Sequence, residues 1–177
     1  MKKIERKEAI RYFESLDNLN SFHEQFNYQD NDRAIVIVGI AFIEDLLLYC
    51  LESFFPEYEN NKSTVYRMLN HSGVLGTYSS KVNMLYCLGF IDKMIKTDLI
   101  LLGEIRNLFA HKTTITFEDE NIIKKCKSFK WHEELMMMPA PKEASAMEIF
   151  KVEVNTIVSH LNGLPSFIRG EKRKLKK

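Results

Sequence analysis

The chain has 177 residues, of which 45% are hydrophobic and 28% charged, and this composition indicates one globular domain rather than a disordered segment. Its 25 basic and 24 acidic residues give a net charge of +1, which provides no overall electrostatic reason to expect nucleic-acid binding. The three cysteines lack C-x-x-C spacing, so free thiols in a reducing compartment are expected. The start, MKKIERKEAIRYF, lacks the apolar core of a signal peptide, and we therefore expect a cytoplasmic protein.

The first half of the chain predicts two long helices. Apolar residues recur at helical spacing over residues 5–27, and a second helix is expected over about 32–55, where Pro56 ends it. Its run Ala34–Leu51 is barely long enough to cross a membrane. An acidic residue at the centre of a span costs about 2.5–3.5 kcal/mol, and Glu44 and Asp45 lie near the middle of this one. The pattern therefore predicts a buried core helix and no membrane association.

The remainder of the chain also has helical patterning. A short helix is expected over Ser63–Leu69, followed by one over Ser79–Phe90 that Gly89 ends. Thr97 or Asp98 is expected to begin the helix that ends at His111, and Thr116 with Asp119 to cap a helix over 117–130. The prolines Pro139 and Pro141 mark a loop before a last helix over Ala144–Leu161. These elements predict an all-α fold, a single-domain bundle of six to seven helices over 1–168.

A basic tail follows this domain. Residues 169–177 read RGEKRKLKK, with six basic residues and one acidic residue. Such a tail is typical of a solvated terminus, and it could equally attract RNA or an acidic partner.

The hexapeptide from Arg106 to His111, RNLFAH, carries the most informative polar residues. Asn107 and His111 are four residues apart and share one face of a helix, and the long side chain of Arg106 can reach a ligand near that face. A guanidinium, an amide and an imidazole together suit a phosphodiester, because arginine binds the phosphate and histidine transfers a proton near neutral pH. The alternative is structural: arginine and histidine at a helix end can pair with acids or backbone carbonyls.

Glu44 is a possible supporting residue. A buried acid needs a partner, and Glu44 could pair with Arg106 and orient its guanidinium, or it could lie on a solvated face with Asp45. The other four histidines have no metal-ligand spacing, so no metal site is predicted. Gly73 and Gly76 lack the lysine of a phosphate-binding loop, and no cofactor is predicted either.

Three segments occur in an order that resembles the mannitol repressor (MtlR-like) family over about residues 32–130. They read DRAIVIVGIAFIEDLLLYCLESFFP, GVLGTYSSKVNMLYCLGFID and LLGEIRNLFAHKTTITFEDENIIKKC. The matching residues are Glu44, Gly73, Leu75, Gly76, Ser79, Lys81, Tyr86, Leu88, Gly89, Arg106, Asn107, Phe109, Ala110, His111, Phe117 and Asp119. Val74 departs from the family, which often has proline there. In addition, R-N-x-x-x-H matches the Arg-x(4–6)-His signature of HEPN-type helical domains.

The resemblance implies two competing functions. The leading hypothesis is a mannitol-repressor-like regulator, a homodimer or higher oligomer that acts through contacts with an unidentified protein partner and has no DNA-binding motif of its own. The alternative is a HEPN-type, metal-independent endoribonuclease, a toxin or defence effector, in which His111 would be the general acid/base and Arg106 would stabilise the phosphate. Whether the chain is an enzyme therefore stays open, and RNA is a possible partner. Sequence-specific DNA binding is not predicted, because no basic recognition helix follows a short turn.

Overall fold

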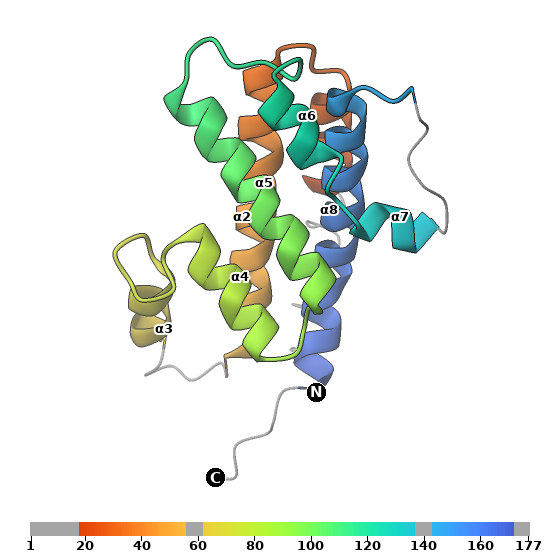
Figure 1. The fold of residues 1–177 in the computed structure, drawn as a ribbon. Helices are drawn as coiled ribbons and strands as arrows, with labels where there is room; N and C mark the ends of the chain where they lie inside the picture. The colour runs from red at the N-terminus through yellow and green to blue at the C-terminus, as the bar shows by residue number, and fades with distance from the viewer. Residues whose placement is uncertain (1–17, 56–61, 137–142, 172–177) are drawn as a thin grey trace, which may run out of the picture.

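The computed structural model describes residues 18–55, 62–136 and 143–171, and their regular structure is entirely helical, as predicted. A helical segment over residues 18–27 precedes seven further helices (Figure 1). These helices are α2 (Asp32–Phe54), α3 (Lys62–Leu69), α4 (Tyr78–Cys87), α5 (Lys93–His111), α6 (Glu120–Cys126), α7 (Trp131–Met136) and α8 (Ala146–Glu171).

Helix α2 lies at the centre of the bundle and packs against α8, α5 and α4. The side chain of Asn31 caps it by accepting a hydrogen bond from the backbone N–H of Ala34 at 2.9 Å. By length and hydropathy α2 could cross a membrane, and half of its most apolar window is buried inside the bundle. Its buried side chains, which include Ile35, Ile43 and Leu47, contribute to the hydrophobic core. The apolar character of this helix is therefore explained by core packing.

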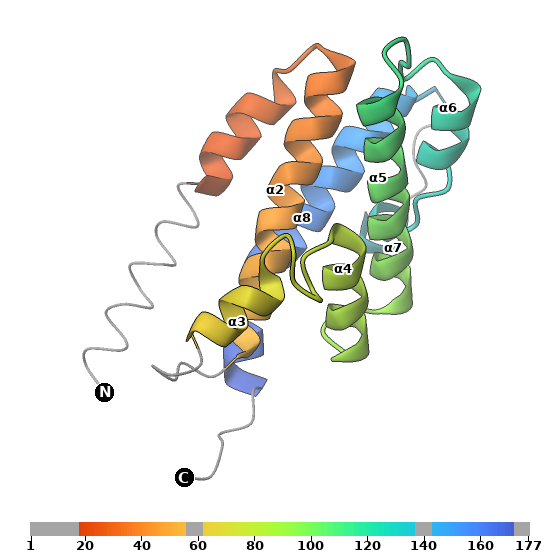
Figure 2. The same cartoon turned by 90° about the vertical axis from the view of Figure 1, so that its left-hand side faces the viewer.

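Residues 18–27 run alongside α2 (Figure 2). Phe22 stacks on Phe42 of α2 with ring centroids 4.3 Å apart. Phe26 lies against Gly39, where an added Cβ atom would come within 2.8 Å of the Phe26 ring. The glycine thus allows this segment to approach α2 closely. Residues 5–17 of the first predicted helix lie outside the described residues.

Helix α5 begins earlier than the sequence predicted. Its N-cap is Asp92, whose carboxylate accepts hydrogen bonds from the backbone N–H groups of Met94 and Ile95, both at 2.8 Å. Asp98, which we expected as a cap, is fully buried within the helix. Its carboxylate instead accepts hydrogen bonds from the backbone of Lys130 and Trp131. A tertiary contact therefore decided the role of this residue.

The helix predicted over 117–130 is present but shorter, because α6 spans only Glu120–Cys126 and a separate helix, α7, begins at Trp131. Asp98 accepts the N–H groups of Lys130 and Trp131, which in a continuous helix would donate to the carbonyls of residues 126 and 127. Asp119 also acts differently from expectation: its carboxylate accepts a hydrogen bond from the Thr116 N–H at 2.7 Å and makes no cap bond to α6.

Helix α8 runs ten residues beyond the predicted end at Leu161 and contains Pro165. Proline has no N–H group, so the Leu161 carbonyl, four residues earlier, loses its helical partner. The thiol of Cys50 on α2 donates a weak hydrogen bond to this carbonyl, with a sulfur–oxygen distance of 3.6 Å. Burial raises the pKa of Cys50 to about 12, which keeps the sulfur protonated. Arg169, assigned to the tail, also lies in α8 and donates to the Ser53 hydroxyl at 3.0 Å.

Candidate functional site

The carboxyl end of α5, which carries the predicted site, is tied to the start of α2. Arg33 of α2 donates from Nη1 to the Phe109 carbonyl and from Nη2 to the Lys112 carbonyl, the latter at 2.6 Å. The last carbonyl groups of an α-helix have no N–H partner within the helix, and a cation near them is favourable. Asp32 accepts the Phe117 N–H at 2.9 Å and fixes the turn that follows. The end of α5 is therefore a rigid platform.

The apolar residues of the motif anchor this platform. Phe109 is fully buried and contacts Phe117 with ring centroids 5.3 Å apart. Phe117 in turn contacts Phe150 of α8 at the same separation. The aromatic chain links α5 to α8 through the core.

The three polar residues of the motif face outward to different degrees. Asn107 and His111 are exposed, and Arg106 is half-buried. The Nε atom of Arg106 is buried and has no hydrogen-bond partner in the described part of the chain. In those same ranges no ion pair involves Arg106 or His111. The structure thus places these three residues together at one helix end, where no ion pair joins Arg106 or His111 to another described residue.

Glu44 has a different partner from the one considered in the sequence. Its carboxylate forms an ion pair with Lys81 of α4, with the nitrogen and oxygen atoms 2.9 Å apart. Lys81 is only 4% exposed and also donates to the Gly76 carbonyl at 3.0 Å. The pair therefore joins α2, α4 and the glycine turn, while Asp45 is exposed. Glu44 does not orient Arg106 through an ion pair.

Tyr78 fills the space between α4 and α5, close enough to both Glu44 and Arg106 for their charges to act on it. Burial raises the pKa of this tyrosine, so its hydroxyl stays protonated, and it donates to the Leu99 carbonyl at 3.0 Å. An added Cβ atom at Gly103 would lie 3.0 Å from the Tyr78 ring. Sequence analysis did not name Tyr78, and it listed Lys81 only as part of the family resemblance, although a lysine within the apolar pattern of α4 was a signal that an acid must lie opposite it.

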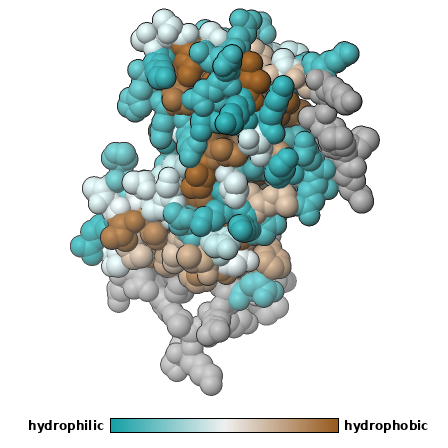
Figure 3. Space-filling view, in the orientation of Figure 1, coloured by the Kyte–Doolittle hydropathy of each residue, from teal (hydrophilic) through white to brown (hydrophobic). Residues whose placement is uncertain are grey.

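The charged residues around α5 and α6 form a mixed surface. Hydrophilic side chains cover much of the upper face in Figure 3, with apolar residues between them. Lys125 pairs with Glu104, and Lys130 lies 3.5 Å from Glu133, so these lysines are partly neutralised. Within the described ranges, no group of three or more His, Cys, Asp or Glu side chains is placed to hold a metal ion.

The arrangement at the end of α5 suits recognition of an anionic or hydrogen-bond-accepting group. A guanidinium offers planar, charged donors that bind carboxylate or phosphate in pairs. General acid–base chemistry requires a second group positioned to transfer the proton. No hydrogen bond links His111 to a second titratable side chain among the described residues.

Comparison with known proteins agrees with this architecture. The family model for the mannitol repressor, MtlR, matches residues 18–159, which is most of the chain. The chain belongs to the mannitol repressor family. It is thus a mannitol-repressor-like regulator, as the sequence indicated, and the HEPN-type motif stays a prediction. A search of curated protein sequences gives no match.

Two solved structures share the fold. The X-ray structure of the MtlR–HPr complex from Escherichia coli matches with 24% identity and a TM-score of 0.60, covering 85% of this chain and 98% of that one. The crystal structure of YggD from Shigella flexneri, a possible transcriptional regulator, matches with 18% identity and a TM-score of 0.61, covering 81% of this chain and 96% of the other.

Several residues that carried the family resemblance have structural roles. Gly89 adopts a left-handed backbone with φ of 76° at the end of α4, as predicted for a helix stop. Gly73 and Gly76 form tight turns in which an added Cβ atom would come within 2.2 Å of backbone oxygens. The Glu44–Lys81 pair likewise has a structural role, because it joins α2 to α4.

Proposed function

We propose that this mannitol-repressor-like regulator acts by binding a protein partner through the carboxyl end of α5, and that the partner is HPr. The proposal is supported by Arg106, which is half-buried at the end of α5 and forms no ion pair with a described residue. A guanidinium offers paired, charged donors that can bind the carboxylate or carbonyl oxygens of a partner. Asn107 and His111 add exposed hydrogen-bonding groups beside it.

The identity of the partner rests on the comparison. A protein of the same fold, MtlR of Escherichia coli, has been crystallised in complex with HPr. Arginine is enriched at the centres of protein interfaces, where it pairs with acidic or carbonyl groups of the partner. The near-zero net charge and the ion pairs of Lys125 and Lys130 offer little for the DNA backbone. Protein contact therefore fits this surface better than direct DNA binding.

The test is calorimetric titration of the purified protein with HPr from the same cell. Arg106→Ala is expected to weaken binding by at least about tenfold, with smaller losses for Asn107→Ala and His111→Ala. Arg67→Ala is the matched control, because Arg67 is an exposed arginine on α3 whose side chain donates to the Ser63 carbonyl of the same helix, and α3 lies far from the end of α5 in Figures 1 and 2. HPr binding that is unchanged in Arg106→Ala would contradict the proposed surface.

A second measurement separates this function from the ribonuclease alternative. Single-stranded RNAs of varied sequence are incubated with wild type and His111→Ala in the presence of EDTA. We expect no cleavage by either protein. Cleavage by the wild type that His111→Ala abolishes, with unchanged melting, would replace the regulator with the enzyme.

We further propose that the regulator is a cytoplasmic homodimer. The family resemblance supports this assembly, and Ile37 and Val38 of α2 are large apolar side chains that are more than a third exposed. Light scattering at micromolar concentration should give twice the chain mass of 20.8 kDa. A monomer mass under those conditions would contradict the proposal.

A further inference from the structure

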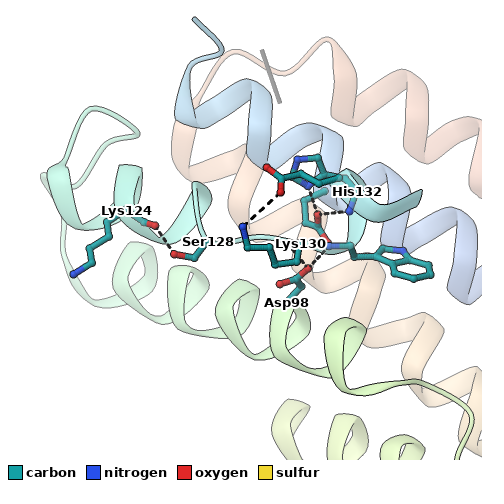
Figure 4. A network of polar contacts seen from close by, with 8 residues as sticks. Asp98, Lys124, Ser128, Lys130 and His132 are labelled. Carbon is teal, nitrogen blue, oxygen red and sulfur yellow. Dashed lines mark hydrogen bonds and ion pairs between the residues drawn. The ribbon is translucent and has the colours of Figure 1, made fainter. Parts of the chain in front are cut away.

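A cluster of three ionisable side chains lies buried where α5, α7 and α8 meet, away from the exposed end of α5 (Figure 4). Asp98 of α5 and Glu153 of α8 are fully buried, and His132 of α7 is 3% exposed. Charged groups are rarely buried unless they are paired, so this cluster needs an explanation of its own. It is also the main polar link between α7 and the rest of the bundle.

His132 and Glu153 form the first half of the link. The Nδ1 atom of His132 lies 2.6 Å from a carboxylate oxygen of Glu153, and the backbone N–H of His132 donates to the same oxygen at 3.3 Å. The second carboxylate oxygen of Glu153 and the Nε2 atom of His132 are buried without a partner in the described structure. The contact is therefore a compact pair that solvent does not screen.

Asp98 forms the second half. One carboxylate oxygen accepts the N–H groups of Lys130 and Trp131 at 2.8 and 2.7 Å, which holds the start of α7 against α5. The other oxygen is buried and unpartnered among the described residues. Protonation of the other oxygen would keep both hydrogen bonds, because a single carboxylate oxygen of Asp98 accepts them.

The charges in the cluster do not balance at every pH. Two carboxylates face one imidazole, and Glu133 adds a further negative charge that acts on His132. The side chain of Lys130 is 60% exposed and pairs with Glu133 rather than entering the cluster. When the imidazole loses its proton, it no longer offers a positive charge to the carboxylates beside it.

We propose that Asp98, His132 and Glu153 form a proton-dependent latch that holds α7 on α5 and α8 and releases it as the pH rises. The hydrogen bonds of Asp98 and His132 can form when both groups are protonated. Loss of these protons leaves the cluster with more negative charge than positive charge. The regulated element is a six-residue helix, which can undock without unfolding the core formed by α2, α5 and α8.

The signs of the pKa shifts agree with this direction. Burial raises the pKa of Asp98 from 3.8 to about 6, so its contribution to docking is full below about pH 4 and is lost as the pH rises through about 6. The hydrogen bond to Glu153 raises the pKa of His132 above 6.5, so its contribution is lost as the pH rises through that higher value. Both groups therefore favour docking at lower pH.

One neighbour acts in the opposite direction. His160 of α8 contacts Trp131 edge-on at 5.3 Å, and burial lowers its pKa from 6.5, an effect that the charge of Asp92 partly opposes. Its contribution is full above pH 6.5 and is lost as the pH falls toward the lower folded value. Asp98 and His160 therefore oppose each other below about pH 6.5, and His132 is the group that weakens docking as the pH rises above that value.

Hydrogen exchange of the full chain tests the latch. Protection factors of the α7 amides, corrected for intrinsic exchange at each pH, should fall at least about tenfold between about pH 6 and pH 8, since each proton released changes an equilibrium by up to about tenfold per pH unit. The α2 amides should stay protected and report that the bundle remains folded. Trp131, the only tryptophan in the chain, provides a fluorescence signal from the start of α7.

The decisive variant is Asp98→Asn, whose remaining carbonyl can accept both N–H groups while carrying no charge. It should keep α7 protected to higher pH than the wild type, whereas Glu134→Gln, the same change of charge on the exposed side of α7, should leave the profile unaltered. Three outcomes would overturn the proposed latch. The protection of α7 could be independent of pH, it could fall together with that of α2, or its pH profile could be identical in wild type and Asp98→Asn. His132→Gln provides a second check, because it should leave α7 weakly protected already at pH 6.

Discussion

Helix α5 carries polar side chains in two opposite environments, one exposed to solvent and one fully buried. At its carboxyl end Arg106, Asn107 and His111 reach the surface and make no side-chain hydrogen bond or ion pair within the described residues. In its amino half Asp98 is fully buried and serves a cluster built from two other helices. The difference teaches that an exposed polar group such as those of Asn107 and His111 needs no protein partner, because water can hydrogen-bond to it, whereas the buried carboxylate of Asp98 depends on the groups packed around it.

The largest effect is expected from the apolar residue beneath the exposed end. Phe109→Ala removes a fully buried ring that contacts Phe117, and it should lower the free energy of unfolding by about 4 kcal/mol. Urea denaturation followed by circular dichroism measures this loss. If the change costs less than about 1 kcal/mol, the rigidity of the exposed end does not come from the aromatic core.

The next effect comes from the buried cluster. Glu153→Ala leaves His132 buried without its partner, and we expect a loss of about 3 kcal/mol in the same denaturation experiment. Glu153→Gln keeps a hydrogen-bonding oxygen and should cost clearly less. Equal losses for the two variants would show that packing volume, rather than the polar partner, matters at this position.

A smaller effect is expected from Arg33, which holds the exposed end of α5 against the start of α2. Arg33→Ala removes the donors to the Phe109 and Lys112 carbonyls at the end of α5, at a cost of about 1–2 kcal/mol. Hydrogen exchange should localise the added mobility to residues around 108–117. Arg33→Lys keeps a cation near the helix end but cannot reach both carbonyls, and it should recover only part of the loss.

The smallest effect is expected from the exposed residues themselves. Asn107→Ala and His111→Ala should each change the free energy of unfolding by about 0.5 kcal/mol or less, because both side chains are exposed and unpartnered within the described part of the chain. The readout is the midpoint of thermal unfolding. A large loss for either variant would assign the motif to stability and remove the physical basis for a recognition surface.

The sequence predicted the elements whose signals are local. The long apolar pattern of α2, the stop at Gly89 and the position of RNLFAH at a helix end are all found in the structure. These features depend on periodicity, backbone conformation and neighbouring residues, which a sequence contains. The resemblance to the mannitol repressor family was also visible in the order of three segments, and the family match confirms it.

Tertiary contacts decided the rest. The partner of Glu44 is Lys81, 37 residues away, and no spacing rule connects the two. Asp98 resembles a helix cap in sequence, yet its carboxylate accepts the N–H groups of Lys130 and Trp131 at the start of α7. Helix α8 continues through Pro165 with Cys50 of α2 bonded to the carbonyl that the proline leaves open. In each case a polar group is satisfied by a residue distant in the chain, because burial demands a partner and only the packed bundle determines which one is within reach.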